Sequence, residues 1–174
     1  MPLYAFEGKS PQVHPTAFIA PTASIVGDVV IEEDASVWYG AVIRGDYSQV
    51  IVRKGANVQD GAVIHGPPGE PTEIGEGATV AHNCVVHGAV LGAECLIANG
   101  AIVLDGAKIG PRALVAAGAV VPAGMEIGGG VLAAGVPAQV KRPIAGTPSE
   151  FWVTANPAAY RELAERHRSD VREV

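Results

Sequence analysis

Three histidines, His65, His82 and His87, lie within one short stretch of the sequence, from Asn57 to His87. Neutral imidazole is the commonest metal ligand among side chains, and a catalytic zinc site uses three protein ligands and leaves a fourth position for water. A lone histidine on a strand is usually ordinary surface or core structure. Three of the chain's five histidines in one stretch indicate a metal site, provided that the fold brings them together.

The elements that must position these histidines are six-residue repeats. A period of six fits neither a helix nor an alternating strand, but it is typical of a β-helix in which each hexad is one short strand with a corner and three hexads form a coil. We therefore predict an all-β solenoid over residues 1–143. Its two longest uninterrupted series of aliphatic residues are Val13, Ile19, Ile25, Ile31, Val37, Ile43 and Leu91, Ile97, Val103, Ile109, Val115, Val121, Ile127.

The hexad count places the histidines on the faces of this prism. His65 and His87 each directly follow an inward-pointing aliphatic residue, so both point outward from the same slot of adjacent coils, about 5 Å apart. His82 is the third residue of a hexad on the preceding face, too far away to join them within its own chain. Three prisms around a threefold axis would bring it to a neighbour's pair. The sequence therefore predicts a homotrimer with a three-histidine metal site at each subunit interface.

Two further residues fall into register with this site. Asp60 lies one coil below His82 on the same face, where it could orient or neutralise groups around the metal. Arg44 lies one coil below His65.

The repeat is interrupted twice beside these residues and ends at Ile127. The steps from Ile43 to Val52 and from Ile64 to Ile74 are three and four residues too long, and we expect the extra residues to form outward loops, where functional sites tend to lie. Residues 144–174 form an exit segment and a C-terminal helix that packs on the prism. Asn156 is the expected N-cap, with Pro157 at the first helical position and an earlier helical turn over 149–155.

Composition excludes several classes of protein. The net charge is −6 and basic residues form no run, so a nucleic-acid partner is not expected. No apolar segment is long enough to span a membrane, and the N-terminus does not resemble a signal peptide. Cys84 and Cys95 do not make a disulfide framework, which favours a reduced, cytoplasmic protein. We expect both thiols to be buried or at corners. A redox-sensitive role for Cys84 is the alternative.

The segments that match one known family are Arg44-Gly45-Asp46, Asn57-Val58-Gln59-Asp60, Gly61-Ala62-Val63-Ile64-His65, His82-Asn83-Cys84-Val85-Val86-His87-Gly88, Ala134-Gly135-Val136-Pro137-Ala138 and the helix around Tyr160. These segments resemble the γ-class carbonic anhydrases. The resemblance implies a left-handed parallel β-helix, a homotrimer, and Zn²⁺, or Fe²⁺ or Co²⁺, held by His65 and His87 of one subunit and His82 of the partner subunit. It further implies a lyase that reversibly hydrates CO2 to bicarbonate with hydroxide on the metal.

The resemblance also implies roles for the surrounding residues. Arg44 and Asp60 would form an ion pair across the subunit interface. Gln59 and Asp46 would position the reacting water or bicarbonate, with Asn57 nearby. Tyr160, on the C-terminal helix, would reach the mouth of the site.

One part of the family pattern is missing. Tyr47 stands where a proton-shuttling glutamate would follow Arg44-Gly45-Asp46, and the loop after His65 offers Glu70 or Glu73 as a substitute. This departure bears on the rate of turnover, which needs a titratable group at the mouth, and leaves metal binding unaffected.

Other functions compete with this interpretation. Proteins with hexapeptide repeats are often acyltransferases that bind acyl-CoA between prisms, but this chain lacks the long loop with a single catalytic histidine that those enzymes tend to carry. A metal-dependent thioesterase of CoA esters and a non-catalytic scaffold clamped by metal are further alternatives.

Overall fold

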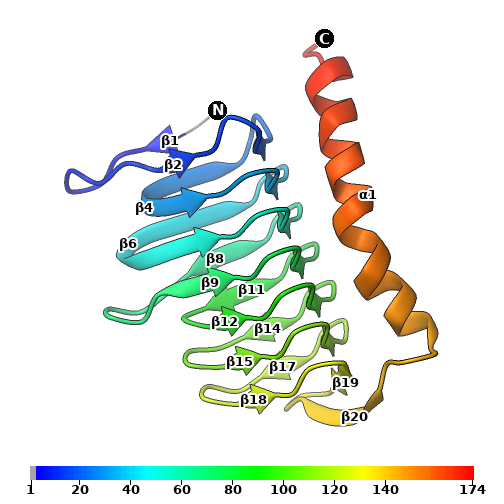
Figure 1. Cartoon of the computed structure of the whole chain (residues 1–174). Coiled ribbons are helices and arrows are strands. Elements are labelled where there is room, and N and C mark those ends of the chain that lie inside the picture. Colours follow the sequence, from blue (N-terminus) through cyan, green and yellow to red (C-terminus); the bar gives the residue numbers. More distant parts are fainter. Residues whose placement is uncertain (1–2) are drawn as a thin grey trace.

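The computed structural model describes residues 3–174, which form a parallel β-solenoid of about seven turns followed by a single helix (Figure 1). This is the predicted fold class, and the architecture is consistent with a left-handed β-helix of hexapeptide repeats. The strands stack in three columns that form the faces of a prism.

The first column carries His65 and His87. It contains β1 (Leu3–Tyr4), β4 (Ser24–Ile31), β6 (Val42–Val52), β8 (Val63–His65), β11 (Val85–His87), β14 (Ile102–Val103) and β17 (Val120–Val121). Strands β4 and β6 are long enough to turn the corner into the second column. That column continues with β2 (Gln12–Val13), β9 (Thr72–Ile74), β12 (Val90–Leu91), β15 (Lys108–Ile109) and β18 (Glu126–Ile127).

The third column faces the helix, and His82 lies just after one of its strands, β10 (Thr79–Val80). It contains β3 (Phe18–Ile19), β5 (Ser36–Val37), β7 (Asn57–Val58), β10 (Thr79–Val80), β13 (Leu96–Ile97), β16 (Leu114–Val115) and β19 (Val131–Ala134), closed by the antiparallel β20 (Gln139–Pro143). The antiparallel strand covers the open edge that the last coil would otherwise expose.

Strand register confirms the hexad count. Val86 pairs with Ile64 on the coil below and Val103 on the coil above, and all three side chains are fully buried. Aliphatic residues of equivalent hexads in successive coils therefore stack into one continuous core, and the small residues between them fill the corners. Burial of apolar surface at about 25 cal/mol per Å² makes this stack the main stabilising term.

The two interruptions of the repeat take different forms. Residues 66–71 form a loop, as expected. The extra residues after Ile43 form an outward bulge: residues 46–49 remain within strand β6, but Gly45 pairs with Gly27 and Val50 with Val29, so the residues between them have no partner in β4. Gly27 permits this close pairing: its φ is +77°, and a β-carbon there would collide with the carbonyl of Gly45.

The stack also continues one strand beyond the predicted end at Ile127. Ala133 pairs with Val115 and takes the inward position six residues after Ile127. Its small side chain is fully buried. The series of aliphatic residues in the sequence therefore ends one strand before the solenoid does.

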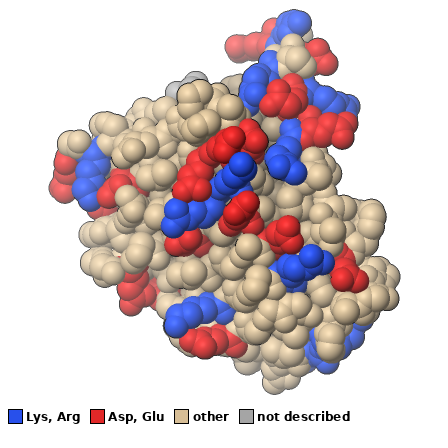
Figure 2. Space-filling model, viewed as in Figure 1, with Lys and Arg blue, Asp and Glu red and all other residues tan. Residues whose placement is uncertain are grey.

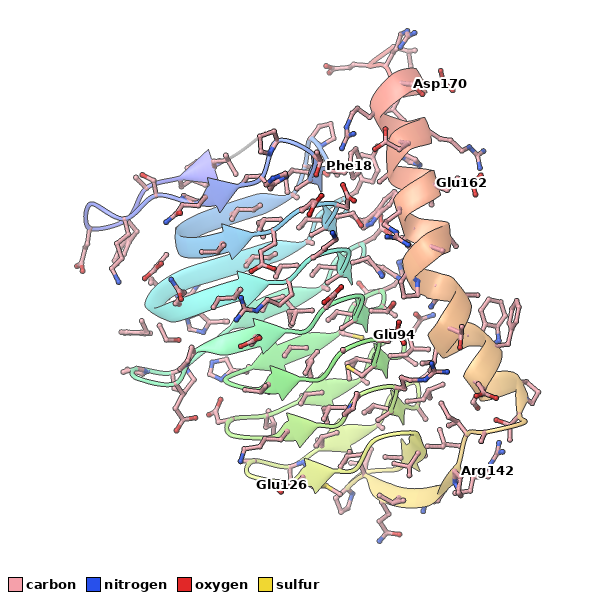
Figure 3. The ribbon with its side chains drawn as sticks, in the orientation of Figure 1. Phe18, Glu94, Glu126, Arg142, Glu162 and Asp170 are labelled. Carbon is pink, nitrogen blue, oxygen red and sulfur yellow. The ribbon has the colours of Figure 1, made fainter. Side chains whose placement is uncertain are left out.

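A single helix, α1 (Pro148–Asp170), runs back along the prism toward the N-terminal coils (Figures 1 and 3). Its start differs from the expected Asn156–Pro157 boundary: Thr147 precedes the helix, Pro148 occupies the first turn, and Pro157 lies in the interior. The first half is stabilised because Val153 packs with Leu96, Leu114 and Ile144. This tertiary burial offsets the cost of an interior proline.

The second half of α1 is anchored by an aromatic cluster. Trp38 is 2% exposed and lies 5.3 Å from Tyr160 and 4.9 Å from His167, measured between ring centroids. Phe18, labelled in Figure 3, completes the cluster from the preceding coil, toward the N-terminus. These contacts fix Tyr160 against the third column.

Charges of both signs mix on the face of Figure 2. Arg53, for example, pairs with Glu32 and Glu73 at 2.8 and 2.7 Å. This face offers no broad basic area of the kind that binds nucleic acid. Within residues 3–174, no helix is long and apolar enough to cross a membrane.

Candidate functional site

His65 and His87 stand in register on adjacent coils, as the hexad count predicts. Nδ1 of His65 lies 3.0 Å from Nε2 of His87, and the ring centroids are 5.0 Å apart. Two ligand nitrogens of a tetrahedral zinc ion lie about 3.3–3.4 Å apart, because each bond is about 2.0–2.1 Å long. The pair therefore fits two adjacent positions of such a metal after a small adjustment.

A carboxylate binds the far nitrogen of each ring. Oδ1 of Asp46 lies 2.8 Å from Nε2 of His65, and Asp105 contacts Nδ1 of His87. Metal-binding histidines usually present their second nitrogen to a carboxylate or carbonyl, which fixes the tautomer and the ring orientation. The second nitrogen of each ring is thus bound by a carboxylate, as is usual for metal-binding histidines.

Asp46 is held in its ionised form by its neighbours. Burial acts to raise the pKa of this carboxyl, but hydrogen bonds from His65 and Arg44 outweigh it, so its pKa lies below the usual value. The carboxylate also accepts a hydrogen bond from the backbone N–H of Tyr47 at 3.0 Å. Asp46 is therefore suited to orient His65 and the Arg44 guanidinium together.

His82 lies on another face, after β10, and is oriented in the same way. Its Nδ1 is 2.9 Å from Oδ2 of Asp60, which stands one coil below as the register predicts. Its Nε2 points toward the Tyr160 hydroxyl at 3.5 Å. The His82 side chain is 41% exposed, against 12% for His65, so its ring is accessible from outside the chain.

A buried polar chain supports the His82 side. Gln59 donates from Nε2 to Oδ1 of Asn57 at 2.9 Å, and Asn57 donates from Nδ2 to Thr79 at 2.9 Å. Gln59 and Asn57 are 2% and 1% exposed. Gln59 shares a cavity of about 370 Å³ with His82 and Tyr160.

Burial raises the pKa of Tyr160, and the charge of Asp60 raises it further. The phenol is therefore a neutral hydroxyl at the mouth of this cavity.

The predicted residues thus fall into two half-sites on one chain. His65, His87, Asp46 and Arg44 form one, while His82, Asp60, Gln59, Asn57 and Tyr160 form the other. Across residues 3–174, no three His, Cys, Asp or Glu side chains of one chain cluster as metal ligands. A three-histidine centre therefore needs both half-sites, from different subunits.

For some predicted roles, the structure of one chain contains no contact that supports the role. Arg44 binds Asp46 and Asp60 binds His82, so the Arg44–Asp60 pair across the interface stays a prediction. Glu70 lies on the exposed 66–71 loop, and its role as proton shuttle also stays a prediction. Glu73 is engaged by Arg53. The Tyr47 ring, 66% exposed, lies 6.1 Å from that of His65.

Sequence reasoning missed Asp105. The hexad count places Leu104, not Asp105, in the slot above His87, because Asp105 is the third residue of its hexad. Asp105 reaches His87 from the corner that follows β14. A search for acidic residues at the corners next to each histidine would have found it.

Both cysteines are buried free thiols. Burial raises the pKa of Cys84 to about 11 and that of Cys95 to about 12. Cys84 donates to the carbonyl of Ala98 at 3.1 Å. These thiols are therefore poor nucleophiles and poor metal ligands in the folded chain.

The fold and the repeat define a hexapeptide-repeat protein. The family model for bacterial transferase hexapeptide repeats (six repeats) matches residues 88–123. The carnitine operon protein CaiE of Escherichia coli O157:H7 is 38% identical over 176 residues, covering all of this chain and 88% of that protein. The chain therefore belongs to the hexapeptide-repeat transferase family, with CaiE as a homologue.

Solved structures agree over nearly the whole chain. A hexapeptide transferase family protein from Anaplasma phagocytophilum has a TM-score of 0.91 at 36% identity, covering 95% of this chain and 98% of its own. A candidate acetyltransferase from Bacillus cereus has a TM-score of 0.93 at 35% identity, with 96% of each chain covered. These descriptions name transferases and do not extend to the γ-class carbonic anhydrases.

Proposed function

We propose that the chain is a metal-dependent enzyme whose active site lies between subunits of a homotrimer and directs water to a carbonyl carbon. The observation that carries this proposal is the pairing of His65 with His87, each ring backed by its own carboxylate. Surface histidines without a function have no reason to share one orientation, whereas metal ligands do.

The residues divide the work as follows. His65 and His87, with His82 of the partner subunit, would hold Zn²⁺, or Fe²⁺ or Co²⁺. Such a metal supplies Lewis acidity and lowers the pKa of bound water from 15.7 to about 7. Asp46 and Asp105 fix the two rings from behind.

Gln59 and Tyr160 supply neutral hydrogen-bonding groups at the mouth. Gln59 is held rigidly by Asn57, so its remaining amide atoms can orient water or a substrate oxygen without reorganisation.

Two carbonyl substrates fit this arrangement. Hydration of CO2 is the reaction that the resemblance to γ-class carbonic anhydrases implies. Hydrolysis of an acyl thioester, such as a CoA ester, agrees better with the transferase family and with the description of the Bacillus cereus protein. The family comparison therefore favours an acyl compound, and CO2 is the competing substrate.

Acyl transfer is the second candidate function. Asp105 and His87 form a carboxylate–imidazole pair, which can act as a general base toward the hydroxyl or amine of an acceptor without a metal. The acetyltransferase description of a relative supports this alternative.

One set of measurements separates these functions. We expect the anaerobically purified trimer to contain about one metal per chain, and His82→Ala to lose it. The same preparation is then assayed for CO2 hydration by stopped flow and for CoA release from acetyl-CoA with and without an acceptor amine. Acyl transfer in the metal-free protein would contradict the metal-dependent proposal. Bound metal without turnover of either substrate would support the alternative of a non-catalytic scaffold whose subunits are held together by metal.

A further inference from the structure

A groove beside His82 is larger than CO2 requires. It has a volume of about 370 Å³ and lies between the N-terminal half of α1 and the corners that follow β10, β13 and β16. A water molecule occupies about 30 Å³ in the liquid, and CO2 has only three heavy atoms. Pockets that bind organic ligands start at about 300 Å³. The space therefore matches a longer substrate.

The groove has a polar end and an apolar body. Gln59, His82 and Tyr160 lie at the polar end, and Leu96, Leu114 and Trp152 supply the apolar part of the body. The neutral polar side chains of the body are Asn99, Ser149 and Asn156. No Lys, Arg, Asp or Glu lines the groove, so it lacks the charges that bind a phosphate or a carboxylate. The uncharged body suits a neutral chain that packs on its apolar side chains.

The corners that stack on His82 line this path along the axis of the prism. The two corners above His82 present Asn99 and Ala117, and Ala98 lies beside them. Each coil rises about 5 Å, so two coils give about 10 Å, the length of an extended chain of roughly eight carbons. Trp152, 56% exposed, forms the outer wall from α1.

We propose that this groove binds the hydrocarbon chain of an acyl ester or thioester, with the carbonyl carbon at the His82 end. The inference rests on the proposed function and names its substrate class. In hydrolysis, the water oxygen bonds to the carbonyl carbon and the bond to the leaving sulfur or oxygen breaks. The leaving thiol or alcohol takes one proton, and the carboxylic acid product releases another to solvent at neutral pH.

Chain length provides the first test. The p-nitrophenyl esters of acetate and hexanoate are compared on the zinc-loaded trimer. Each buried methylene contributes about 0.8 kcal/mol, so we expect kcat/KM to be at least about tenfold higher for the hexanoate. Equal or lower kcat/KM for hexanoate would overturn the inference.

Two matched pairs of variants locate the effect in the groove. Ala117→Leu fills the distal groove and should remove most of the preference for hexanoate, whereas Ala93→Leu changes an exposed corner alanine on another face. Trp152→Ala removes the outer wall, and Phe151→Ala changes the neighbouring exposed aromatic, which does not line the groove. Loss of preference in both members of each pair would contradict the assignment. Each variant is first checked for an unchanged oligomeric state.

Binding to the metal-free protein separates this inference from the proposed function. By calorimetry, the neutral amide hexanamide should bind at least about tenfold more tightly than acetamide, and Ala117→Leu should abolish the difference. If the protein holds no metal but shows this binding, the groove stands and the metal-dependent function fails. If metal and CO2 hydration are present but hexanamide binds no better than acetamide, the function stands and the groove assignment fails.

Discussion

Nδ1 of His65 lies 3.0 Å from Nε2 of His87 on the neighbouring coil, although 22 residues separate the two in sequence. The hexapeptide repeat creates this proximity, since Ile64 and Val86, the residues before them, are stacked in the core. Asp46 and Asp105 then bind the outer nitrogens. A rigid stack of strands thereby presents two preoriented imidazoles on one face.

Asp105 should be needed for tight metal binding. Asp105→Asn keeps the size of the side chain but removes the charge that orients His87, and loss of such a partner typically costs 10–100-fold in metal affinity. We expect a loss of about tenfold or more, measured by competition with a chromogenic chelator. Asp34→Asn, at a half-buried corner away from His65, His82 and His87, is the matched control. Equal affinities in all three proteins would show that Asp105 does not orient His87.

The buried thiols should resist modification in the folded protein. Burial raises the pKa of Cys84 to about 11 and that of Cys95 to about 12, so at about pH 8 only about one Cys84 thiol in a thousand is ionised. We expect reaction with a disulfide reagent at least about 100-fold slower in the native protein than in the denatured one. Fast labelling of Cys84 in the native state would instead indicate an exposed, redox-active thiol.

The same shift predicts a pH dependence of stability. The folded-state pKa values of both thiols lie above their unfolded values, so their contribution is present below about pH 9 and is lost as the pH rises through about 11–12. The free energy of unfolding should therefore fall across this window, beyond what a Cys84→Ala, Cys95→Ala double variant shows. An identical slope in the double variant would mean that other groups cause the decline.

Trp38 should contribute much of the docking energy of the helix. It is 2% exposed and packs against Phe18, Tyr160 and His167, so Trp38→Ala should cost about 3–5 kcal/mol. Denaturant unfolding at fixed protein concentration measures this change. Trp152→Ala, at a residue that is 56% exposed, should cost less than about 1 kcal/mol. Similar costs for the two tryptophans would contradict the aromatic anchor.

The repeat in the sequence predicts most of the fold because every inward residue obeys one period. It predicts the register of His65 with His87 and of Asp60 with His82 for the same reason. It fails where tertiary contacts decide the outcome: Pro157 stays inside α1 because Val153 is buried upstream. Asp105 is also missed, because it lies in a corner and contacts His87 from a hexad position that the period does not align with His87.

Exchange of subunits between two inactive variants tests the central claim most directly. His82→Ala chains and His65→Ala chains should each bind no metal alone. When the two are co-expressed, a mixed trimer places an intact His65–His87 pair beside the intact His82 of the partner subunit at one of its interfaces. We predict that isolated mixed trimers contain about one metal per trimer and lose it on chelation. Mixed trimers without metal would contradict a site shared between subunits.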